Sequence, residues 1–276
     1  MSMASLHELK NFADDLPGRN TRTTAFFIGH GSPMNGIEDN VFSRSWADLG
    51  RSLPEPSAVL CISAHWLTEG TYVTAMEQPR TIHDFYGFPQ ALFNVNYPAP
   101  GSPAWAKETA SAITSTKVGL DHEWGLDHGT WSVVRQMYPD AKIPVLQLSI
   151  DYAKPAQYHY DLARELRVLR DKGVLIIGSG NMVHNLRMLN WRQPETGYDW
   201  AEEMNETFKK LIEQGQHEQL IDYGNLGASA HLAIPTPDHY FPLIYTLGLH
   251  QKSDAVAFFN DSLSMGSVSM TSVKIF

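Results

Sequence analysis

The sequence predicts one α/β domain, with a largely parallel or mixed central sheet, helices on both faces and the active site at the carboxyl ends of the strands. Three observations support this fold class. The chain has 276 residues, and 43% of them are hydrophobic, which suffices for one large core. Short apolar runs typical of buried strands recur along the chain, and amphipathic helical patterns lie between them. We expect residues 1–276 to form a single domain, with residues 1–22 as an N-terminal extension.

The predicted strands are short apolar runs rich in β-branched or aromatic residues, which is the composition of strands buried on both faces. Four of these runs are Ala25–Ile28, Ala58–Ile62, Val145–Ile150 and Val174–Ile177. A fifth run, Tyr72–Met76, alternates between apolar and polar residues, which predicts a strand at an edge of the sheet.

Helical patterns separate these runs, and alternation of strands with helices favours a sheet that is largely parallel. The predicted helices are Trp105–Ile113, Thr130–Tyr138, Gln157–Asp171 and Trp200–Ile212. The third is the clearest, because Leu162, Leu166 and Leu169 fall on one face. The segment Gln78–Pro103 is rich in proline, glycine and aromatic residues, which predicts a packed loop over a pocket.

Composition excludes several classes of function. The formal net charge of −9 argues against a nucleic-acid partner, because phosphate binding needs a concentrated basic face. The chain lacks a run of about 18 apolar residues, so we expect no membrane span. The only cysteine, Cys61, lies in an apolar run and is predicted to be a buried, unreactive thiol. We expect a cytoplasmic location, and the oligomeric state is left open.

Three of the 12 histidines share one arrangement, in which a predicted buried strand leads into a turn that carries the histidine. They are His30 in Gly29-His30-Gly31, His65 in Ser63-Ala64-His65-Trp66, and His184 in Gly180-Asn181-Met182-Val183-His184. Ligands of open α/β sheets bind at the carboxyl ends of the strands. Imidazole suits iron, zinc, copper and nickel, so a metal centre assembled from distant segments is predicted at this edge.

Two further histidines stand near predicted helix starts. In Thr236-Pro237-Asp238-His239 the threonine resembles an N-cap, which predicts that His239 lies in the first helical turn. His128 lies just before the helix predicted from Thr130. For any one of these histidines, a hydrogen-bonded structural role is the simpler interpretation, and repetition of the strand and turn arrangement favours ligation. His83 either lines a substrate pocket or has its ring held by Asp84.

Other chemistries find little support in the sequence. A phosphate-binding loop and a Gly-x-Ser-x-Gly nucleophile turn are both missing, and Gly178-Ser179-Gly180 lacks the third glycine of a dinucleotide-binding turn. Asp84, Asp127 and Asp238 each adjoin a histidine, so they are candidates to fix the orientation of imidazole rings.

The chain resembles the class III extradiol ring-cleavage dioxygenases, specifically the branch of the DOPA dioxygenases. The resemblance covers nearly the whole chain and rests on the following motifs: Gly29-His30-Gly31-Ser32-Pro33-Met34, Ser63-Ala64-His65-Trp66, Thr81-Ile82-His83-Asp84-Phe85, Asp127-His128-Gly129, Gly180-Asn181-Met182-Val183-His184-Asn185-Leu186 and Pro235-Thr236-Pro237-Asp238-His239-Tyr240. It implies the α/β fold predicted above and a single catalytic domain.

The resemblance also implies roles for the histidines. His30, His65 and His239 match the metal ligands, and His184 matches the catalytic acid/base or, with zinc bound, a fourth metal ligand. His128 matches a histidine that hydrogen-bonds oxygen or substrate. His239 stands where protocatechuate-type relatives have a glutamate, and three neutral imidazoles suit Zn(II) at least as well as Fe(II). We assign His83 and Phe85 to the substrate pocket.

The expected activity is insertion of O2 into a DOPA-like catechol to give a ring-opened semialdehyde, with Fe(II) required for activity and Zn(II) a plausible bound ion. His184 takes a proton from the catechol in this hypothesis. The alternatives are a zinc-dependent hydrolase, which uses a metal-activated water on the same histidines, and a binding protein with an inert metal site. The sequence leaves open which catechol reacts and which ring bond opens.

Overall fold

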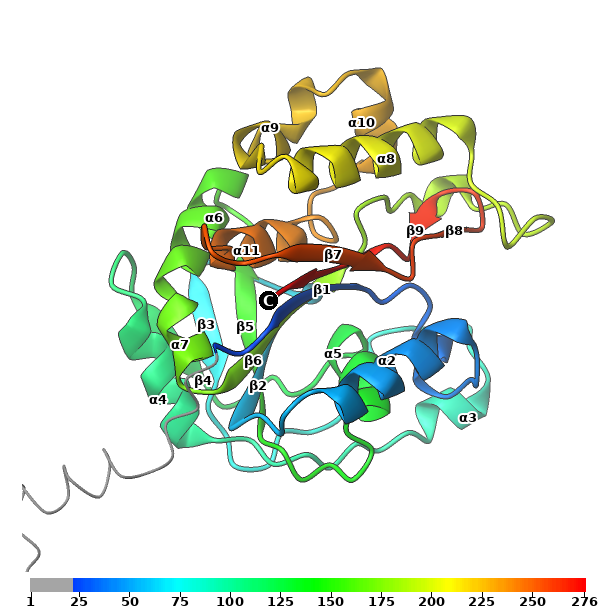
Figure 1. The fold of residues 1–276 in the computed structure, drawn as a ribbon. Helices are drawn as coiled ribbons and strands as arrows, with labels where there is room; N and C mark the ends of the chain where they lie inside the picture. Colours follow the sequence, from blue (N-terminus) through cyan, green and yellow to red (C-terminus); the bar gives the residue numbers. More distant parts are fainter. Residues whose placement is uncertain (1–21) are drawn as a thin grey trace, which may run out of the picture.

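The computed structural model describes residues 22–276, so the predicted N-terminal extension lies almost wholly outside the described residues. Within this range, eight strands form one sheet in the order β4-β3-β5-β2-β6-β1-β10-β7 (Figure 1). The strands of this sheet are β1 (Ala25–Gly29), β2 (Ala58–Thr68), β3 (Thr71–Thr74), β4 (Val118–Asp121), β5 (Val145–Asp151), β6 (Val174–Gly180), β7 (Val256–Phe259) and β10 (Ser272–Ile275). Two short strands, β8 (Leu263–Ser264) and β9 (Val268–Ser269), pair separately.

The middle of the sheet is parallel and its flanks contain antiparallel pairs. Strands β5, β2, β6 and β1 are parallel neighbours, whereas β3 runs antiparallel to β5, and β10 runs antiparallel to β1 and β7. The prediction of a largely parallel or mixed sheet is therefore confirmed. The parallel arrangement brings the carboxyl ends of β1, β2 and β6 to one edge of the sheet.

Helices cover both faces of the sheet (Figure 1). Helices α2 and α5 pack on one face, and α6 and α11 pack on the other, with α8, α9 and α10 forming an outer layer beyond α11. The helices are α2 (Val41–Ser52), α3 (Gln90–Phe93), α4 (Pro103–Ala112), α5 (His128–Met137), α6 (Ala156–Glu165), α7 (Arg167–Asp171), α8 (Asp199–Glu213), α9 (His217–Ile221), α10 (Ala228–Ala233) and α11 (Phe241–Leu249), with short 3-10 turns at Pro33–Gly36, Leu186–Met188 and Tyr223–Asn225.

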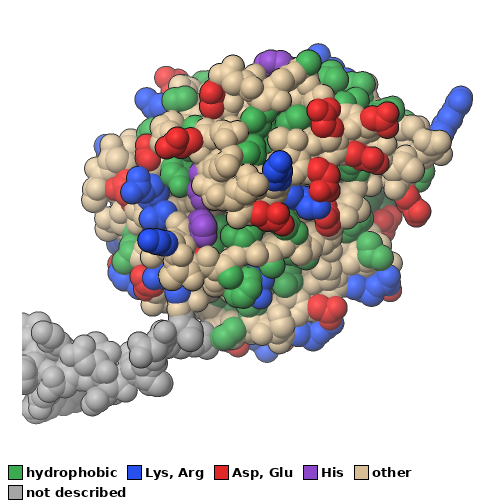
Figure 2. Space-filling model, turned by 45° about the horizontal axis from the view of Figure 1, so that its top comes forward, with side chains coloured by type: hydrophobic (Ala, Val, Ile, Leu, Met, Phe, Trp, Pro, Cys, Tyr) green, Lys and Arg blue, Asp and Glu red, His purple; other side chains and the backbone are tan. Residues whose placement is uncertain are grey.

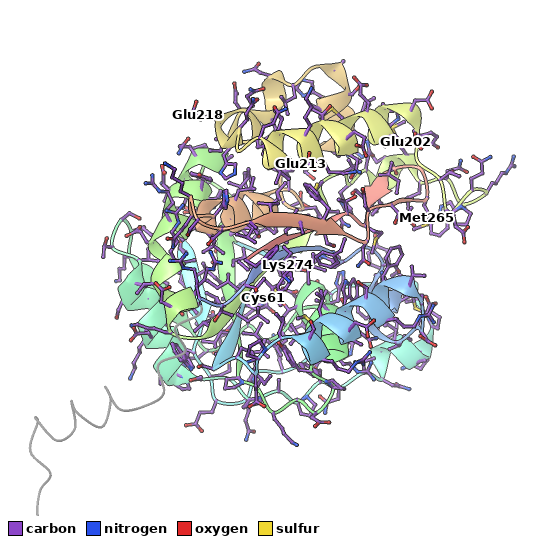
Figure 3. All side chains as sticks on the ribbon, in the orientation of Figure 1. Cys61, Glu202, Glu213, Glu218, Met265 and Lys274 are labelled. Carbon is purple, nitrogen blue, oxygen red and sulfur yellow. The ribbon has the colours of Figure 1, made fainter. Side chains whose placement is uncertain are left out.

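The core follows from the alternation of side chains along the buried strands. Phe27 and Leu60 join the apolar cluster on the side of α6 and α11, whereas Phe26 and Cys61 join the cluster on the side of α2 and α5. Cys61 is fully buried within the sheet region (Figure 3), and burial raises the pKa of its thiol far above the ordinary value. The prediction of a buried, unreactive thiol agrees with this environment.

Two of the predicted elements differ from the structure. The helix predicted over Gln157–Asp171 is divided at Leu166, because the Leu166 amide bonds to the carbonyl of Ala163 three residues earlier and so tightens the turn. The prediction that Tyr72–Met76 forms an edge strand is wrong, since β4 pairs with β3 on its outer side. Strand β4 was not predicted, because its residues are only partly buried and do not form an apolar run in the sequence.

Charges are spread over the surface. Figure 2 shows basic and acidic side chains interspersed on one face, with several acidic side chains grouped at its right side. Glu202, Glu213 and Glu218 lie on the outer layer of helices (Figure 3). Within residues 22–276, every helix is too short or too polar to cross a lipid bilayer. The cytoplasmic location stays a prediction.

The buried His159 predicts a specific loss of stability in acid. Its ring lies between α6 and α11, with Nδ1 3.0 Å from the Tyr245 hydroxyl, and burial lowers its pKa to about 4. In the unfolded chain the His159 imidazole binds a proton near pH 6.5, whereas in the folded chain it binds one only near pH 4. The free energy of unfolding is therefore at its full value above pH 6.5 and decreases as the pH falls toward 4. The full effect is about 3 kcal/mol.

We expect His159→Asn, which keeps a polar atom near Tyr245 but does not titrate, to lose less stability in acid than the wild type. Urea unfolding at pH 7 and pH 4.5 measures the difference, and each protein serves as its own reference at pH 7. Equal losses in the two proteins would contradict the assignment to His159.

Candidate metal centre

The five histidines that the sequence places near strand or helix ends lie together at the carboxyl edge of the parallel strands. The ring centroids of His30 and His65 are 5.1 Å apart, and each lies about as far from the ring of His239, at 5.3 and 5.0 Å. His128 lies 3.9 Å from His65, and His184 lies 3.5 Å from His239. A cluster assembled from distant segments, as predicted, is therefore present.

His30 is positioned by the end of β1. Its backbone amide bonds to the carbonyl of Gly180, so the chain leaves β1 beside the end of β6. The left-handed backbone of Gly31, with φ of +59°, then turns the chain away into the short 3-10 turn at Pro33–Gly36. His30 is 1% exposed, and its ring points toward the other histidines.

The sequence predicts that His65 lies in a turn after the strand, and this prediction is wrong. Strand β2 continues to Thr68, and its pairing with β5 shifts register between Ile62 and Leu67. His65 falls within this irregular stretch, which frees its ring from the regular alternation of the strand. The apolar run in the sequence ends at Ile62, and for this reason the predicted strand ends there as well.

His239 lies in a turn and not in the first turn of a helix. Helix α11 begins at Phe241, because the carbonyl of His239 accepts the backbone N–H of Asn181 and is not available to the helix. This bond fastens the turn to the end of β6. Gly180 lies so close to this carbonyl that a β-carbon there would be 2.2 Å from the oxygen of His239, so only glycine permits the contact.

Helix α5 positions His128, its first residue, and two carboxylates hold the start of the helix. Asp127 is the N-cap and accepts the Thr130 amide, and it also accepts bonds from Ser63 and Gln147. Burial raises the pKa of Asp127, and the bonds from Gln147 and Ser63 act against this rise. Asp84 accepts the backbone N–H of His128 at 2.9 Å.

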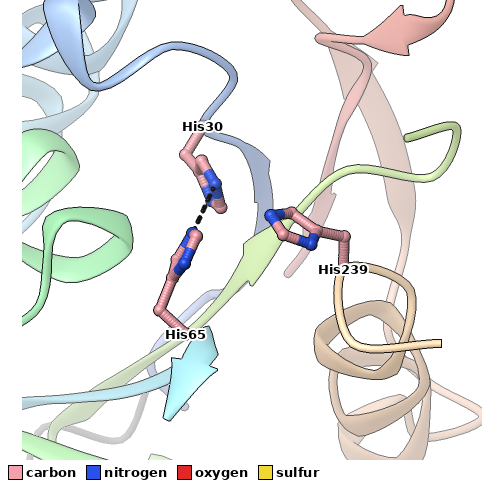
Figure 4. A group of neighbouring side chains, drawn as sticks. All are labelled: His30, His65 and His239. Atoms are coloured by element: carbon pink, nitrogen blue, oxygen red, sulfur yellow. Dashed lines mark hydrogen bonds between the residues drawn. The ribbon is translucent and has the colours of Figure 1, made fainter. Parts of the chain in front are cut away.

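His30, His65 and His239 have the geometry of a metal-binding triad. One ring nitrogen of each lies within 4.8 Å of those of the other two. Nε2 of His30 and Nε2 of His65 face each other at 3.2 Å, and His239 approaches the pair from the side of α11 (Figure 4). By the same distance, His184 forms a group with Asp238 and His239, and not with His30 and His65.

The outer nitrogens of the triad show that the donor set fits a metal cation. Ser179 donates its hydroxyl proton to the Gly129 carbonyl, so it accepts the Nδ1 proton of His30 at 3.0 Å. Asp238 in the same way accepts the Nδ1 proton of His239. The Nε2 atoms of these rings therefore carry lone pairs, which are the ligand form of imidazole.

Burial also favours the neutral, ligand form of these rings. Desolvation, with the neighbouring His239 as the next cause, holds the pKa of His30 well below its ordinary value. Desolvation and then His128 lower the pKa of His65. Desolvation and then His239 lower the pKa of His184. Several imidazoles gathered in one buried place resist protonation, because a second positive charge there is poorly solvated.

The two residues assigned to the substrate pocket differ in their contacts with the histidine cluster. The ring of Phe85 is 5.6 Å from the ring of His128, so it borders the cluster. His83 places Nε2 2.9 Å from the carbonyl of Val95, and its ring lies 5.8 Å from Phe85. The ring neighbours of His83 are Phe85, Phe93 and Trp131, and none of them is a histidine of the cluster. Within residues 22–276, His83 makes no hydrogen bond to Asp84, so the interpretation that Asp84 holds its ring is not supported.

Two positioning residues lie in stretches of sequence that are quoted above, but their roles beside the metal ligands were not predicted. Ser179 and Gly129 belong to β6 and α5, and they meet only because the fold brings these elements together. A β-carbon on Gly129 would lie 2.5 Å from the Ser63 hydroxyl and 2.8 Å from the His65 ring. The position beside His65 thus requires glycine.

We expect Gly129→Ala to weaken metal binding by displacing the His65 ring, by about 10-fold or more, as other outer contacts of metal ligands do. Competition with a chelator for Zn(II) measures the affinity. Gly224→Ala is the matched control, because a β-carbon at Gly224 meets nothing within 4 Å. Equal affinity of both variants and the wild type would contradict the role of Gly129.

The chain is similar to proteins of one family over most of its length. Residues 24–274 match the family described as the catalytic LigB subunit of aromatic ring-opening dioxygenase. The 4,5-DOPA dioxygenase extradiol of Escherichia coli (strain K12) is 49% identical over 265 residues, which cover 95% of this chain and 97% of that protein. The protein of the same name from Beta vulgaris is 35% identical, over 90% of this chain and 95% of its own length.

A solved structure supports the same comparison. The crystal structure of an uncharacterized protein from Escherichia coli K12 superposes with a TM-score of 0.81 and 43% sequence identity. It covers 92% of this chain and 100% of its own. The resemblance in fold and sequence therefore extends beyond the histidine motifs to the whole described domain.

Proposed function

Because the chain belongs to the family of the catalytic LigB subunit of aromatic ring-opening dioxygenases, we propose that it opens a DOPA-like catechol with O2 at an iron(II) ion held by His30, His65 and His239. The chain is an extradiol aromatic ring-opening dioxygenase of class III, in the branch of the DOPA dioxygenases. Its substrates are accordingly a small molecule and O2. We propose that the described residues act as one catalytic domain.

The observation that carries the proposal is the triad of histidines, in which Ser179 holds the outer nitrogen of His30 and Asp238 holds that of His239. Three protein ligands leave further coordination positions open for substrate. When bound, iron(II) supplies the redox chemistry that activates O2, whereas zinc has no redox chemistry. We therefore propose iron as the active metal and zinc as an ion that the same nitrogens accept.

We propose His184 as the base that accepts a proton from a catechol hydroxyl. Its ring stacks on His239 at an interplanar angle of 12°, so it lies beside the triad. Burial keeps its imidazole neutral, which leaves a nitrogen free to accept the proton. The positive charge that His184 then gains lies close to Asp238, which offsets part of its cost.

We propose His128 as the residue that hydrogen-bonds substrate or O2 on the opposite side of the triad. Its ring lies 3.9 Å from that of His65 and 5.7 Å from that of His30. The ring of Phe85 packs edge-on against His128 and offers an apolar surface to a flat ring. His83 packs against Phe85 and, in this proposal, contacts substrate less directly.

A zinc hydrolase is the alternative that the same nitrogens permit, but the residues around the triad do not favour it. Metal hydrolases commonly use a carboxylate base beside the activated water. The carboxylates nearest to the triad are Asp84 and Asp238, and both face outer ring nitrogens. Their positions suit the orientation of imidazoles and not the activation of a water.

The test compares two metals on one protein. The chain is stripped with a chelator, reloaded anaerobically with Fe(II) or Zn(II), and mixed with L-DOPA in air while O2 uptake and a yellow ring-opened product are recorded. We expect turnover with Fe(II) alone. Unsubstituted catechol and a dihydroxycinnamate, tested in parallel, show whether the amino acid side chain matters. O2 uptake with none of these catechols at full iron loading would contradict the proposed substrate class.

A further inference from the structure

We infer that Asp84 is a positioning residue shared by His65 and His128, so that one carboxylate orients both a metal ligand and a histidine that contacts substrate. This inference rests on the proposed function for the roles of the two histidines. Asp84 lies in the long segment Gln78–Pro103, which comes from neither of the strands that carry the triad. Its segment is therefore separate from the elements that carry the five histidines of the cluster.

One oxygen of Asp84 serves His128. Oδ1 accepts the backbone N–H of His128 at 2.9 Å and also lies 3.0 Å from Nδ1 of the same residue. Two contacts to one residue fix the carboxylate relative to the first turn of α5. They also hold the Nδ1 side of the His128 ring toward Asp84.

The other oxygen of Asp84 faces His65. Oδ2 lies 3.4 Å from Nδ1 of His65, whose Nε2 faces His30. Within residues 22–276, Asp84 Oδ2 and His128 Nδ1 are buried, and neither atom has a hydrogen-bond partner of good geometry. A buried carboxylate oxygen needs a donor, and the Nδ1 protons of the two imidazoles are the donors within reach.

The consequence is that Asp84 selects the same tautomer in both rings. A proton on Nδ1 leaves the lone pair on Nε2, which His65 needs for ligation and which His128 presents to substrate or O2. Asp238 does the same for His239 alone. A carboxylate that serves two rings couples the metal site to the substrate contact, whereas one that serves a single ring does not.

The test reads the tautomers directly by NMR of the metal-free protein with 15N-labelled histidine. We expect His128 to carry its proton on Nδ1 in the wild type, with the signals assigned by their loss in His128→Gln. In Asp84→Asn the proton is expected to move to Nε2, whereas Asp84→Glu keeps the wild-type tautomer. Asp238→Asn is the matched control, because it is expected to alter His239 and to leave His128 unchanged.

Activity and metal affinity give the second measurement. We expect Asp84→Asn to lower both kcat and Zn(II) affinity by about 10-fold to 100-fold, and Asp84→Glu to restore part of each. A proton on Nε2 of His128 in the wild type would overturn the inference even if no Asp84 variant folds. So would an unchanged His128 tautomer in Asp84→Asn. Because the NMR readout needs no turnover, failure of the proposed substrate or metal would be seen separately.

Discussion

His30→Ala is expected to lose bound metal and to lower ring-opening activity by about 1000-fold or more, which corresponds to about 4 kcal/mol of transition-state stabilisation. His30 lies at the centre of the cluster, and its Nε2 faces that of His65 at 3.2 Å. Alanine removes one of three ligands and also removes the N–H group that donates to the Ser179 hydroxyl. The remaining two imidazoles hold a metal only weakly.

Metal content after dialysis and O2 uptake with a catechol measure this result together. His122→Ala is the matched control, because His122 is exposed and stands outside the cluster. It should retain both metal and activity. An His30→Ala protein that keeps a full equivalent of metal and normal turnover would show that the triad is not the metal site.

His184→Gln is expected to keep its metal and to lose activity by about 100-fold to 10,000-fold, the range typical of a lost general base. Glutamine retains a polar side chain of similar length but does not accept a proton. The triad of His30, His65 and His239 does not include His184, so metal binding should be intact. The stacked ring of His239 keeps its bond to Asp238.

Metal content and kcat of the same preparation distinguish the two roles of His184. If His184→Gln loses metal as fully as His30→Ala does, His184 is a fourth ligand and the base must be sought elsewhere. A loss confined to kcat at constant metal content supports the assignment as base.

The middle of the fold was predictable from sequence because its strands are buried on both faces. Runs such as Ala25–Ile28 and Val174–Ile177 are continuous apolar segments, and the structure places them side by side as β1 and β6. The outer strands were not predictable in this way. Strand β10 contains Ser272 and Lys274, and its place beside β1 depends on antiparallel contacts with a distant part of the chain.

The histidines of the site were predictable because each stands beside a recognisable apolar run or helix-start pattern in the sequence. The local conformation of two was not. The register shift around His65 depends on β5, and the turn at His239 depends on the Asn181 amide, so both follow from contacts that are distant in sequence. The same is true of Ser179, because its contact with His30 joins residues that are distant in sequence.

The most direct test of the central claim is to follow isotopic oxygen into the product. Protein loaded with Fe(II) is given L-DOPA under 18O2, and the ring-opened product is trapped and analysed by mass spectrometry. An extradiol dioxygenase places both atoms of one O2 molecule in a single product molecule. The label at the aldehyde oxygen decreases with time, because this oxygen exchanges with water. A product without label, or O2 consumption that yields only hydrogen peroxide and a quinone, would contradict ring opening by this chain.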